Sequence, residues 1–434
     1  MDLDQDNRRT PAENHVGRRV LLVSHGYWPW ARAHAERMLA LSWALVKRGH
    51  DVHVLTAHRH DVHLFDDDDP ALLPPVTVHR VSDGTSLPLG RLRMQLPDLM
   101  LNLFSLLVGY PDRYRLWAER IVHYCAHRAA DLDPALVVSS SSPGSAHVAG
   151  HKLQRLFGCP WVADFRDQWL GNPMRTEWRG WRVLSERRWY RRTLEQADLL
   201  TTVNDQIADL LRRHRVERGL SSNESRVEVF PNGYWERWFR GAQPELPAAV
   251  GRRRLALYAG VTYGRYGWDL LCDLARALEE VAPGAWCVGL AGGTGLGDPL
   301  PPVCAAGPVW LGFVSPKKLP SYLLSADVLI IVARPNEVPG GGTYLKSYPY
   351  MRSGRPVVSF GPEHLRWKPL DRVCPVAYFR PSHTLDAAQY LVTTDLAPIE
   401  DMSRVRAQSE EYSFEKTMNG FAQSLSLVGR RHRA

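Results

Sequence analysis

The chain has 434 residues, more than one hydrophobic core usually serves, and this length predicts two domains. Its hydrophobic content of 44% and charged content of 23% are typical of a globular protein and argue against a largely disordered chain. Basic residues outnumber acidic ones, 54 to 46, and the net charge is +8. Such a charge suits an anionic ligand or an anionic membrane surface, but it also occurs in proteins that have neither partner.

The cysteines and the chain start both point to a reducing compartment. Six cysteines lie far apart without a CxxC pair, which argues against a disulfide framework and a zinc ribbon. Residues 1–17 are polar, lack the apolar segment of a secretory signal and are predicted to form a disordered tail. No run of about 18 apolar residues occurs, so no membrane-spanning helix is predicted. We expect a cytoplasmic protein, with peripheral contact at the inner face of the membrane left open.

The first half of the chain alternates short apolar runs with helical patterns. A helix ending at Gly49 separates the first two predicted strands, as in a Rossmann-like β–α–β unit, although no GxGxxG follows the first strand. The predicted strands are Arg19–Ser24, Val52–Thr56, Leu136–Ser139, Trp161–Ala163, Leu199–Val203 and Val227–Phe230.

Periodicity is lost over residues 236–253, where a linker is predicted, and the alternation then begins again. The second series of strands is Leu255–Ala259, Cys287–Ala291, Val309–Gly312, Val328–Ala333, Pro356–Phe360 and Val376–Phe379. A single final helix is predicted over Met402–Val428. We therefore predict an α/β protein with two Rossmann-like domains facing across a cleft, 18–235 and 254–415, followed by a C-terminal helix and basic tail, 416–434.

Three segments allow more than one interpretation. Residues 58–69 hold three histidines and five aspartates without regular ligand spacing, so a solvated loop is favoured over a metal site. Leu96–Tyr110 is apolar and fits a buried helix or a flap at an acceptor site or membrane surface. Arg175–Arg192 interleaves arginine with tryptophan, which fits either a helix with a buried aromatic face or a surface for nucleic acid or anionic lipid.

In the first half, two loops that follow predicted strands carry polar side chains. One contains His147, and the other contains Asp164, Arg166 and Asp167. Ligands bind at the carboxyl ends of strands in open α/β sheets, so these residues are candidates for a site. A buried Asp-x-Arg-Asp run is costly unless it is paired or functional, and a structural arginine–aspartate network is the alternative. His147 alone is a weak signal.

In the second half, two glycine-containing loops suit an anion. Gly260 and Arg265 lie at the end of the first strand of this half, where a glycine turn and an arginine could approach a diphosphate together. Three glycines, ending at Gly342, precede a short helix; the N–H groups of Thr343, Tyr344 and Lys346 would then face an anion, with the Lys346 charge in addition. The alternative is a tight turn without a ligand. Phe313 could pack beside a base or belong to the core.

Taken in order, these pieces resemble retaining glycosyltransferases of the GT-B fold, family 4 (glycosyltransferase group 1). More narrowly, they resemble a branch with a WPP loop, a PPxS-H loop and a DFRDPW box. The resemblance covers about residues 18–428. The matching strings are YWPW (27–30), SPGSAH (142–147), ADFRDQW (163–169), ADLLTTVN (197–204), VFPNGY (229–234), YAGVTYGRYG (258–267), LGFVSPKKLPSYLLSADVLI (311–330) and YLKSYPYMRSGRPVV (344–358).

The resemblance implies transfer of a sugar, of the hexosyltransferase type, from a nucleoside diphosphate sugar to a hydroxyl acceptor, with retention and without a metal or other cofactor. The acceptor is left open between a glycan, a lipid-linked intermediate and a natural product, nucleic acid is not expected as a partner, and the oligomeric state is undetermined. By this resemblance, the residues fall into three groups: catalytic (His147, Asp164, Arg166, Asp167), diphosphate-binding (Gly260, Arg265, Gly342, Thr343, Tyr344, Lys346) and nucleoside-binding (Phe313, Val314, Glu337).

The chain departs from the family pattern at two places. Pro349 occupies the position of a glutamate that binds the ribose in many members, the earlier glutamate of that pair falls at Gly341, and Glu337 lies nearby as a stand-in. The N-terminal Gly-Gly pair is replaced by Ala31 and Ala33. A catalytically impaired GT-B-like binding protein, another nucleotide-sugar enzyme such as an epimerase, and a basic nucleic-acid or membrane-surface protein are therefore the alternatives.

Overall fold

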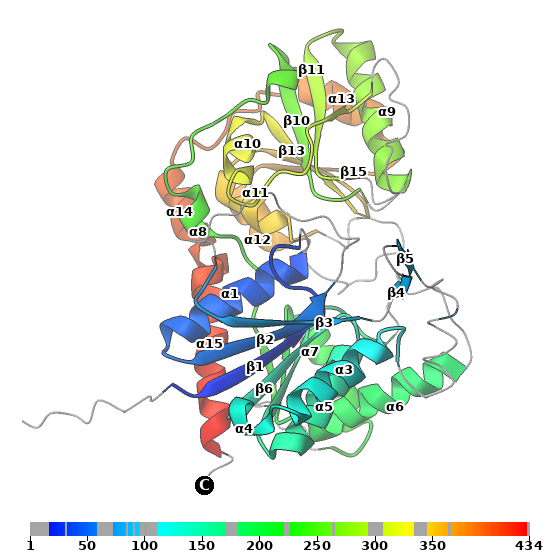
Figure 1. The fold of residues 1–434 in the computed structure, drawn as a ribbon. Coiled ribbons are helices and arrows are strands. Elements are labelled where there is room, and N and C mark those ends of the chain that lie inside the picture. Colours follow the sequence, from blue (N-terminus) through cyan, green and yellow to red (C-terminus); the bar gives the residue numbers. More distant parts are fainter. Residues whose placement is uncertain are drawn as a thin grey trace, which may run out of the picture.

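The computed structural model places the chain in two α/β domains, one above the other in Figure 1, with the C-terminal helix returning to the first domain. The two parallel sheets confirm the predicted fold class and its two Rossmann-like domains. The structure describes residues 17–30, 33–58, 73–83, 86–89, 92–95, 100, 111–170, 181–220, 226–262, 265–293, 307–333, 345–362 and 366–431.

The first domain is built on a parallel sheet whose described strands follow the order β3-β2-β1-β6-β7-β8-β9. The strand order reverses between β1 and β6, the kind of switch point at which open α/β sheets bind ligands. The bounds are β1 (Arg19–Ser24), β2 (Asp51–His58), β3 (Thr77–Ser82), β6 (Leu136–Ser141), β7 (Trp161–Phe165), β8 (Leu199–Thr202) and β9 (Val227–Val229).

Helices cover both faces of this sheet, which explains why its strands are continuous apolar runs. Alternate side chains of β1 enter different apolar clusters: Leu21 and Val23 on one face, Val20 and Leu22 on the other. On the first face lie α3 (Arg115–Ala126), α5 (Ser145–Phe157), α6 (Trp181–Gln196) and α7 (Asp205–Val216), with the short α4 (Ala129–Leu132) after α3. On the second face lie α1 (Ala33–Lys47) and α15 (Phe414–Arg431).

The second domain repeats this arrangement on a smaller parallel sheet, β12-β11-β10-β13-β14-β15. Its strands are β10 (Arg254–Ala259), β11 (Trp286–Ala291), β12 (Val309–Trp310), β13 (Val328–Val332), β14 (Val357–Phe360) and β15 (Val376–Phe379). One face is covered by α9 (Arg265–Val281) and α13 (Thr384–Thr393), the other by α10 (Leu319–Ser325), α11 (Ser347–Ser353), α12 (Lys368–Val373) and α14 (Met402–Ser409).

The chain crosses between the domains twice, and the two crossings lie side by side. The Tyr234 N–H donates to the Tyr412 carbonyl at 3.2 Å, and the Phe414 N–H donates to the Tyr234 carbonyl at 2.8 Å. At Gly233 a Cβ would lie 2.4 Å from the Tyr412 carbonyl oxygen, so this close approach requires glycine. The single helix predicted over Met402–Val428 is therefore wrong: α14 ends at Ser409, the 3-10 turn η5 (Glu410–Tyr412) follows, and α15 begins beyond the crossing.

Other predicted elements are found with ends shifted by two residues or fewer, whereas three features were missed. β3 extends the first sheet. Its residues are exposed or only partly buried, and its sequence is less apolar than those of the central strands. An antiparallel hairpin, β4 (Ser86–Leu89) with β5 (Leu92–Gln95), follows it. The predicted linker contains α8 (Glu236–Phe239) and the 3-10 helix η3 (Ala248–Val250).

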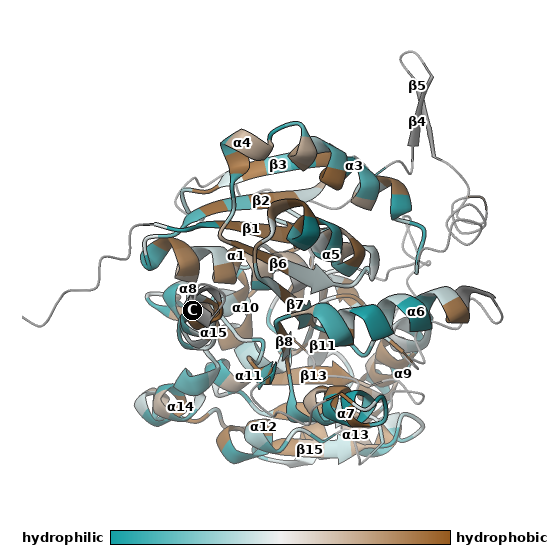
Figure 2. Cartoon of the chain, turned by 90° about the horizontal axis from the view of Figure 1, so that it is seen from below, coloured by the Kyte–Doolittle hydropathy of each residue, from teal (hydrophilic) through white to brown (hydrophobic). Residues whose placement is uncertain are grey.

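The three ambiguous segments are only partly described. Residues 59–69 and 101–110 lie outside the described residues. In the described part of Arg175–Arg192, Trp189 and Tyr190 are buried while Arg187, Arg188 and Arg191 are exposed, which matches a helix with a buried aromatic face. This helix, α6, is largely teal in Figure 2. Within the described ranges, no helix has both the length and the apolar character needed to cross a lipid bilayer.

Candidate active site

The polar residues of the first domain converge because β6 and β7 are neighbouring parallel strands. Ser140 pairs in register with Asp164, so the loops after both strands leave the same edge of the sheet. The β6 loop leads directly into α5, where the Asp112 carboxylate accepts a hydrogen bond from the Ser145 N–H at 2.9 Å. A carboxylate at a helix start is favoured by the exposed N–H groups and the helix dipole.

Asp164 is fully buried, and both its carboxylate oxygens are engaged. Arg37 of α1 donates to them at 3.0 and 3.2 Å, Ser140 donates at 2.8 Å and Thr201 at 2.9 Å. Burial alone would raise the pKa of Asp164, but the Arg37 charge and these hydrogen bonds hold the pKa below its ordinary value. Asp164 is therefore ionised, and all of its hydrogen bonds go to neighbouring side chains. This is the arginine–aspartate network that the sequence analysis gave as the alternative to a catalytic role.

Arg37 is a site residue that the sequence interpretation missed. Its guanidinium also donates to the Phe230 carbonyl at 2.9 Å, the Pro231 carbonyl at 3.3 Å and the Asn232 side-chain oxygen at 3.3 Å. It thus joins the Asp164 carboxylate to the segment that leads into the first domain crossing. A signal was present in the sequence, because Arg37 shares a helix face with Leu41 and Leu45 and a charge on an apolar face demands a partner.

Arg166 and Asp167 lie beside this network and are half-buried. Arg166 donates to the Ser140 hydroxyl at 3.1 Å and to the Ser142 carbonyl at 3.0 Å, so it fastens the β6 loop to the β7 loop. Burial lowers the pKa of Arg166, and the carboxylates of Asp167 and Asp164 oppose that shift. Of the four residues predicted to be catalytic, these two are the ones with surface left for a ligand.

His147 is fully buried on α5 among aromatic rings, with the Phe165 and Trp169 centroids at 4.8 and 5.5 Å. Its Nδ1 lies 2.8 Å from the Ser139 hydroxyl, which accepts a hydrogen bond from the Trp161 indole at 2.7 Å. The Ser139 hydroxyl has one proton to donate and a second lone pair to accept with, so it can pair with either neutral tautomer of the ring. Nε2 has no hydrogen-bond partner within the described part of the chain. Burial lowers the pKa of His147, so the ring is neutral.

A pH prediction follows from the His147 environment. Burial lowers the pKa of His147 to about 3. The folded protein therefore keeps the ring neutral while the unfolded chain takes up a proton below its ordinary pKa of about 6.5, so the free energy of unfolding falls as pH drops through that window. Between about pH 7.5 and pH 5.5 we expect His147 to account for about 1 kcal/mol of this loss. Urea unfolding of the wild type and of His147→Asn at both pH values measures it, and equal pH dependence of the two would contradict the assignment.

In the second domain, the structure brings Gly260 and Lys346 together. Gly260 directly follows β10 and has a φ of +117°, and a Cβ there would lie 3.6 Å from the Lys346 ammonium. The Lys346 Nζ lies 3.5 Å from the ring centroid of Tyr258, a cation–π arrangement that holds the charge over the end of β10. Two residues predicted to bind a diphosphate are therefore adjacent, although 86 positions separate them.

The ends of β10 and β11 also approach each other closely. At Gly292, with a φ of +145°, a Cβ would lie 2.2 Å from the Gly260 carbonyl oxygen. At Gly293 a Cβ would lie 2.7 Å from the Phe313 ring, which is 39% exposed. Phe313 therefore lies over the glycine turn at the edge of the sheet, where a base could stack on it, while Val314 packs half-buried against the second-domain core.

The structure describes only some of the other residues predicted to bind the donor. Arg265 is exposed at the first position of α9. Pro349 is half-buried within α11, and the next residue, Tyr350, accepts a hydrogen bond from the Ala259 N–H at 2.8 Å. Gly342, Thr343, Tyr344 and Glu337 lie outside the described residues.

Contacts between the domains surround α11. Leu345, next to Lys346, packs against the apolar cluster of α1 and α15 in the first domain. Near the other end of α11, Arg352 donates to both oxygens of Glu236 in α8 at 2.7 and 3.1 Å. Lys346 thus lies at the junction of the two domains. Among the residues described, no group of three or more histidine, cysteine or acidic side chains is arranged to hold a metal ion.

Two parallel α/β sheets, joined by paired crossings and a C-terminal helix that returns to the first domain, define the GT-B fold. Residues 32–233, which span most of the first domain, match the family model described as Glycosyl transferase 4-like domain. The first domain is thus similar to glycosyl transferase 4-like domains. No curated protein matches the sequence.

Solved structures agree with this fold over nearly the whole chain. An alpha,alpha-trehalose 6-phosphate synthase from Burkholderia multivorans is 13% identical, has a TM-score of 0.62, and the match covers 96% of this chain and 98% of that one. A structure described as trehalose-6-phosphate from E. coli bound with UDP-2-fluoro glucose has the same identity and TM-score, with coverage of 94% and 98%. A putative UDP-N-acetylglucosamine 2-epimerase from Listeria monocytogenes is 11% identical with a TM-score of 0.55, over 93% and 95%. At these identities the likeness establishes the fold.

Proposed function

We propose that this chain is a retaining, metal-independent glycosyltransferase that moves a sugar from a nucleoside diphosphate sugar to a hydroxyl acceptor. The observation that carries the proposal is the Lys346 ammonium, which lies beside Gly260 over the end of β10. A lysine charge beside a glycine turn, at the carboxyl edge of a parallel sheet, suits a diphosphate. The family match of the first domain supports glycosyl transfer as the reaction.

In the proposed reaction, the bond between the anomeric carbon and the diphosphate oxygen breaks while the acceptor hydroxyl bonds to the same face of the sugar. The hydroxyl proton passes to the departing diphosphate. Lys346 and Arg265 stabilise the negative charge that develops on the diphosphate, which is the electrostatic contribution such a step needs. Phe313 stacks on the base. Gly342, Thr343, Tyr344 and Glu337, which were predicted from the sequence and lie outside the described residues, complete the donor site in this proposal.

The first domain supplies the acceptor side. Arg166 and Asp167 have exposed surface and would contact the acceptor or the sugar. His147 is neutral, with a pKa lowered by burial to about 3, and fully buried, so in this proposal it supports the start of α5 through Ser139 and does not act as a base. Asp164 would act indirectly, by positioning the β7 loop through Arg37 and Ser140. Peripheral contact with an anionic membrane stays a prediction from the sequence.

A donor panel tests the proposal. The protein is incubated with UDP, GDP, ADP and dTDP sugars plus a cell extract as acceptor source, and nucleoside diphosphate release, product mass and product anomeric configuration are measured. A UDP sugar is the first choice, because one similar structure is described as bound with UDP-2-fluoro glucose. Activity that persists in EDTA supports metal independence. No turnover and no rise in melting temperature with any nucleoside diphosphate would overturn the proposal.

Two other outcomes identify the alternatives. The similarity to a putative UDP-N-acetylglucosamine 2-epimerase favours that activity as the second candidate. Epimerisation of UDP-N-acetylglucosamine without an acceptor would establish it. A rise in melting temperature with a nucleoside diphosphate, but no turnover of any sugar donor, would indicate a binding protein that has lost catalysis, as Pro349 at the ribose position would allow.

A further inference from the structure

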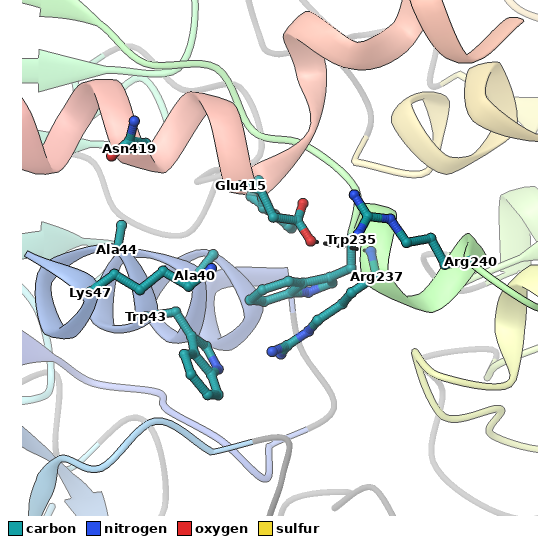
Figure 3. A pocket seen from close by; sticks show the side chains of 10 residues that line it. Ala40, Trp43, Ala44, Lys47, Trp235, Arg237, Arg240, Glu415 and Asn419 are labelled. Atoms are coloured by element: carbon teal, nitrogen blue, oxygen red, sulfur yellow. Dashed lines mark hydrogen bonds between the residues drawn. The ribbon is translucent and has the colours of Figure 1, made fainter. Parts of the chain in front are cut away.

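A second candidate binding site lies beside the paired crossings, and Lys346 is not among the residues that line it. It is a pocket of about 530 Å³ between α1, α15 and the segment that carries α8 (Figure 3). Trp235 and Phe414 contribute to it, and each directly follows one strand of the paired crossing at Tyr234 and Ser413. This size matches that of pockets for small molecules.

The pocket is positively charged. Lys47, Arg237 and Arg240 line it, against a single carboxylate, Glu415. Glu415 is already engaged, because it accepts hydrogen bonds from the N–H groups of Glu236 and Arg237 at 3.2 Å each and so caps α8. The lining thus carries three positive charges and one negative charge, and the negative one already accepts two hydrogen bonds. The pocket therefore favours an anion.

Two of these cations are not paired with other side chains of the described residues. Within the described part of the chain, the side chains of Lys47 and Arg240 make no hydrogen bond or ion pair, and both residues are exposed. Figure 3 shows Lys47 extending along α1 and Arg240 at the opposite end of the pocket. Both are available to an anion without loss of an existing contact.

The pocket also presents aromatic surface. The Arg237 guanidinium lies 5.0 Å from the ring centroid of Trp43 and 4.2 Å from that of Trp235, so it is held in place by the two indoles. The Trp235 Nε1 is buried and has no hydrogen-bond partner among the described residues, an arrangement that costs free energy unless a ligand or water supplies an acceptor. The Arg237 guanidinium and the Trp235 N–H can both donate hydrogen bonds to an oxyanion, and the indole rings can pack against a ring that carries it.

We propose that this pocket binds a small phosphorylated molecule, a phosphate monoester carried on a ring, at a site separate from the donor diphosphate site. The phosphate dianion takes hydrogen bonds from Arg237 and Arg240 of the α8 segment, the ring packs against Trp43, and Lys47 adds positive charge at the other end of the pocket. A ligand in the pocket contacts α1, the crossing segment and α15 together, which happens only in the folded protein. Binding therefore also raises the melting temperature. α8, which carries Arg237, is joined through Glu236 to Arg352 of α11, the helix that begins after Lys346.

Calorimetric titration with inorganic phosphate tests the site in the full chain. Lys47→Glu/Arg240→Glu is expected to weaken phosphate binding by about tenfold or more, because the charge-assisted hydrogen bond from Arg240 and the positive charge of Lys47 are both replaced by repulsion. Arg187→Glu/Arg188→Glu, which makes the same charge change on the exposed face of α6, is the matched control and should bind phosphate like the wild type.

A second comparison separates this site from the donor site. Lys346→Ala should leave the phosphate affinity of the pocket unchanged while it lowers affinity for nucleoside diphosphates. Equal phosphate affinity in the two double variants, or the absence of binding at millimolar phosphate, would overturn the second site. Neither result would bear on glycosyl transfer, which depends on Lys346.

Discussion

Replacement of Lys346 by alanine is expected to lower kcat/KM for sugar transfer by about 100-fold or more, with the fold intact. The ammonium lies beside Gly260 and 3.5 Å from the Tyr258 ring centroid, at the place proposed for the departing diphosphate. Loss of one preorganised charge at a developing oxyanion costs about 100- to 1000-fold in turnover. Steady-state kinetics with the donor identified by the panel, together with the melting temperature, measure the effect.

The control for this variant is a lysine outside the site. Lys152 of α5 forms an ion pair with Glu119 at 2.8 Å on the surface of the first domain, and Lys152→Ala should retain wild-type kinetics. Lys346→Arg should recover part of the activity, because it restores the charge but not the shape of the ammonium. Unchanged kinetics in a folded Lys346→Ala protein would remove Lys346 from the site.

The second large effect is on stability. Asp164→Ala should lower the free energy of unfolding by about 3–5 kcal/mol, because it leaves the fully buried Arg37 guanidinium without its carboxylate. That is a large part of the total stability of a typical domain, about 5–15 kcal/mol. Urea unfolding followed by tryptophan fluorescence measures it. The exposed pair Arg276 and Asp273 is the control, and Asp273→Ala should cost less than about 1 kcal/mol.

A double-mutant cycle decides between the structural and catalytic roles of Asp164. If the carboxylate acts through Arg37, then Arg37→Met/Asp164→Leu should be less destabilised than the sum of the single variants. Asp164→Asn keeps the shape and separates the roles further. An Asp164→Asn protein of wild-type stability without transferase activity would show that the carboxylate takes part in the reaction, and it would contradict the structural assignment.

Much of the fold could be predicted from local patterns. Runs such as VLLV at 20–23 and VLIIV at 328–332 are buried on both faces of a parallel sheet, so they stay apolar throughout and are recognisable without knowledge of their neighbours. β3 was harder to predict, because it lies at the edge of its sheet and none of its residues is fully buried. The break at Glu410–Ser413 was missed for a different reason. The helical pattern continues across it, and only the pairing of Ser413 with Tyr234 interrupts the helix.

Individual residues of the candidate site could be predicted from the sequence, but which of them contact each other could not. Glycine turns after strands indicated Gly260, and a lysine before a short helix indicated Lys346. Their contact depends on the register of β10 beside β13, which no local pattern specifies. The same holds for Arg37 and Asp164, which are 127 positions apart.

Local sequence patterns were enough to predict the order of the elements, the two-domain α/β class and the residue types at the strand ends. Each of these depends on hydrophobic period and turn chemistry within a short stretch of chain. Three properties come from the three-dimensional packing: Asp164 is paired with Arg37, His147 is buried and neutral, and α15 returns to the first domain. Burial and charge partners set these properties, and both come from segments distant in the chain, brought together when the sheets assemble.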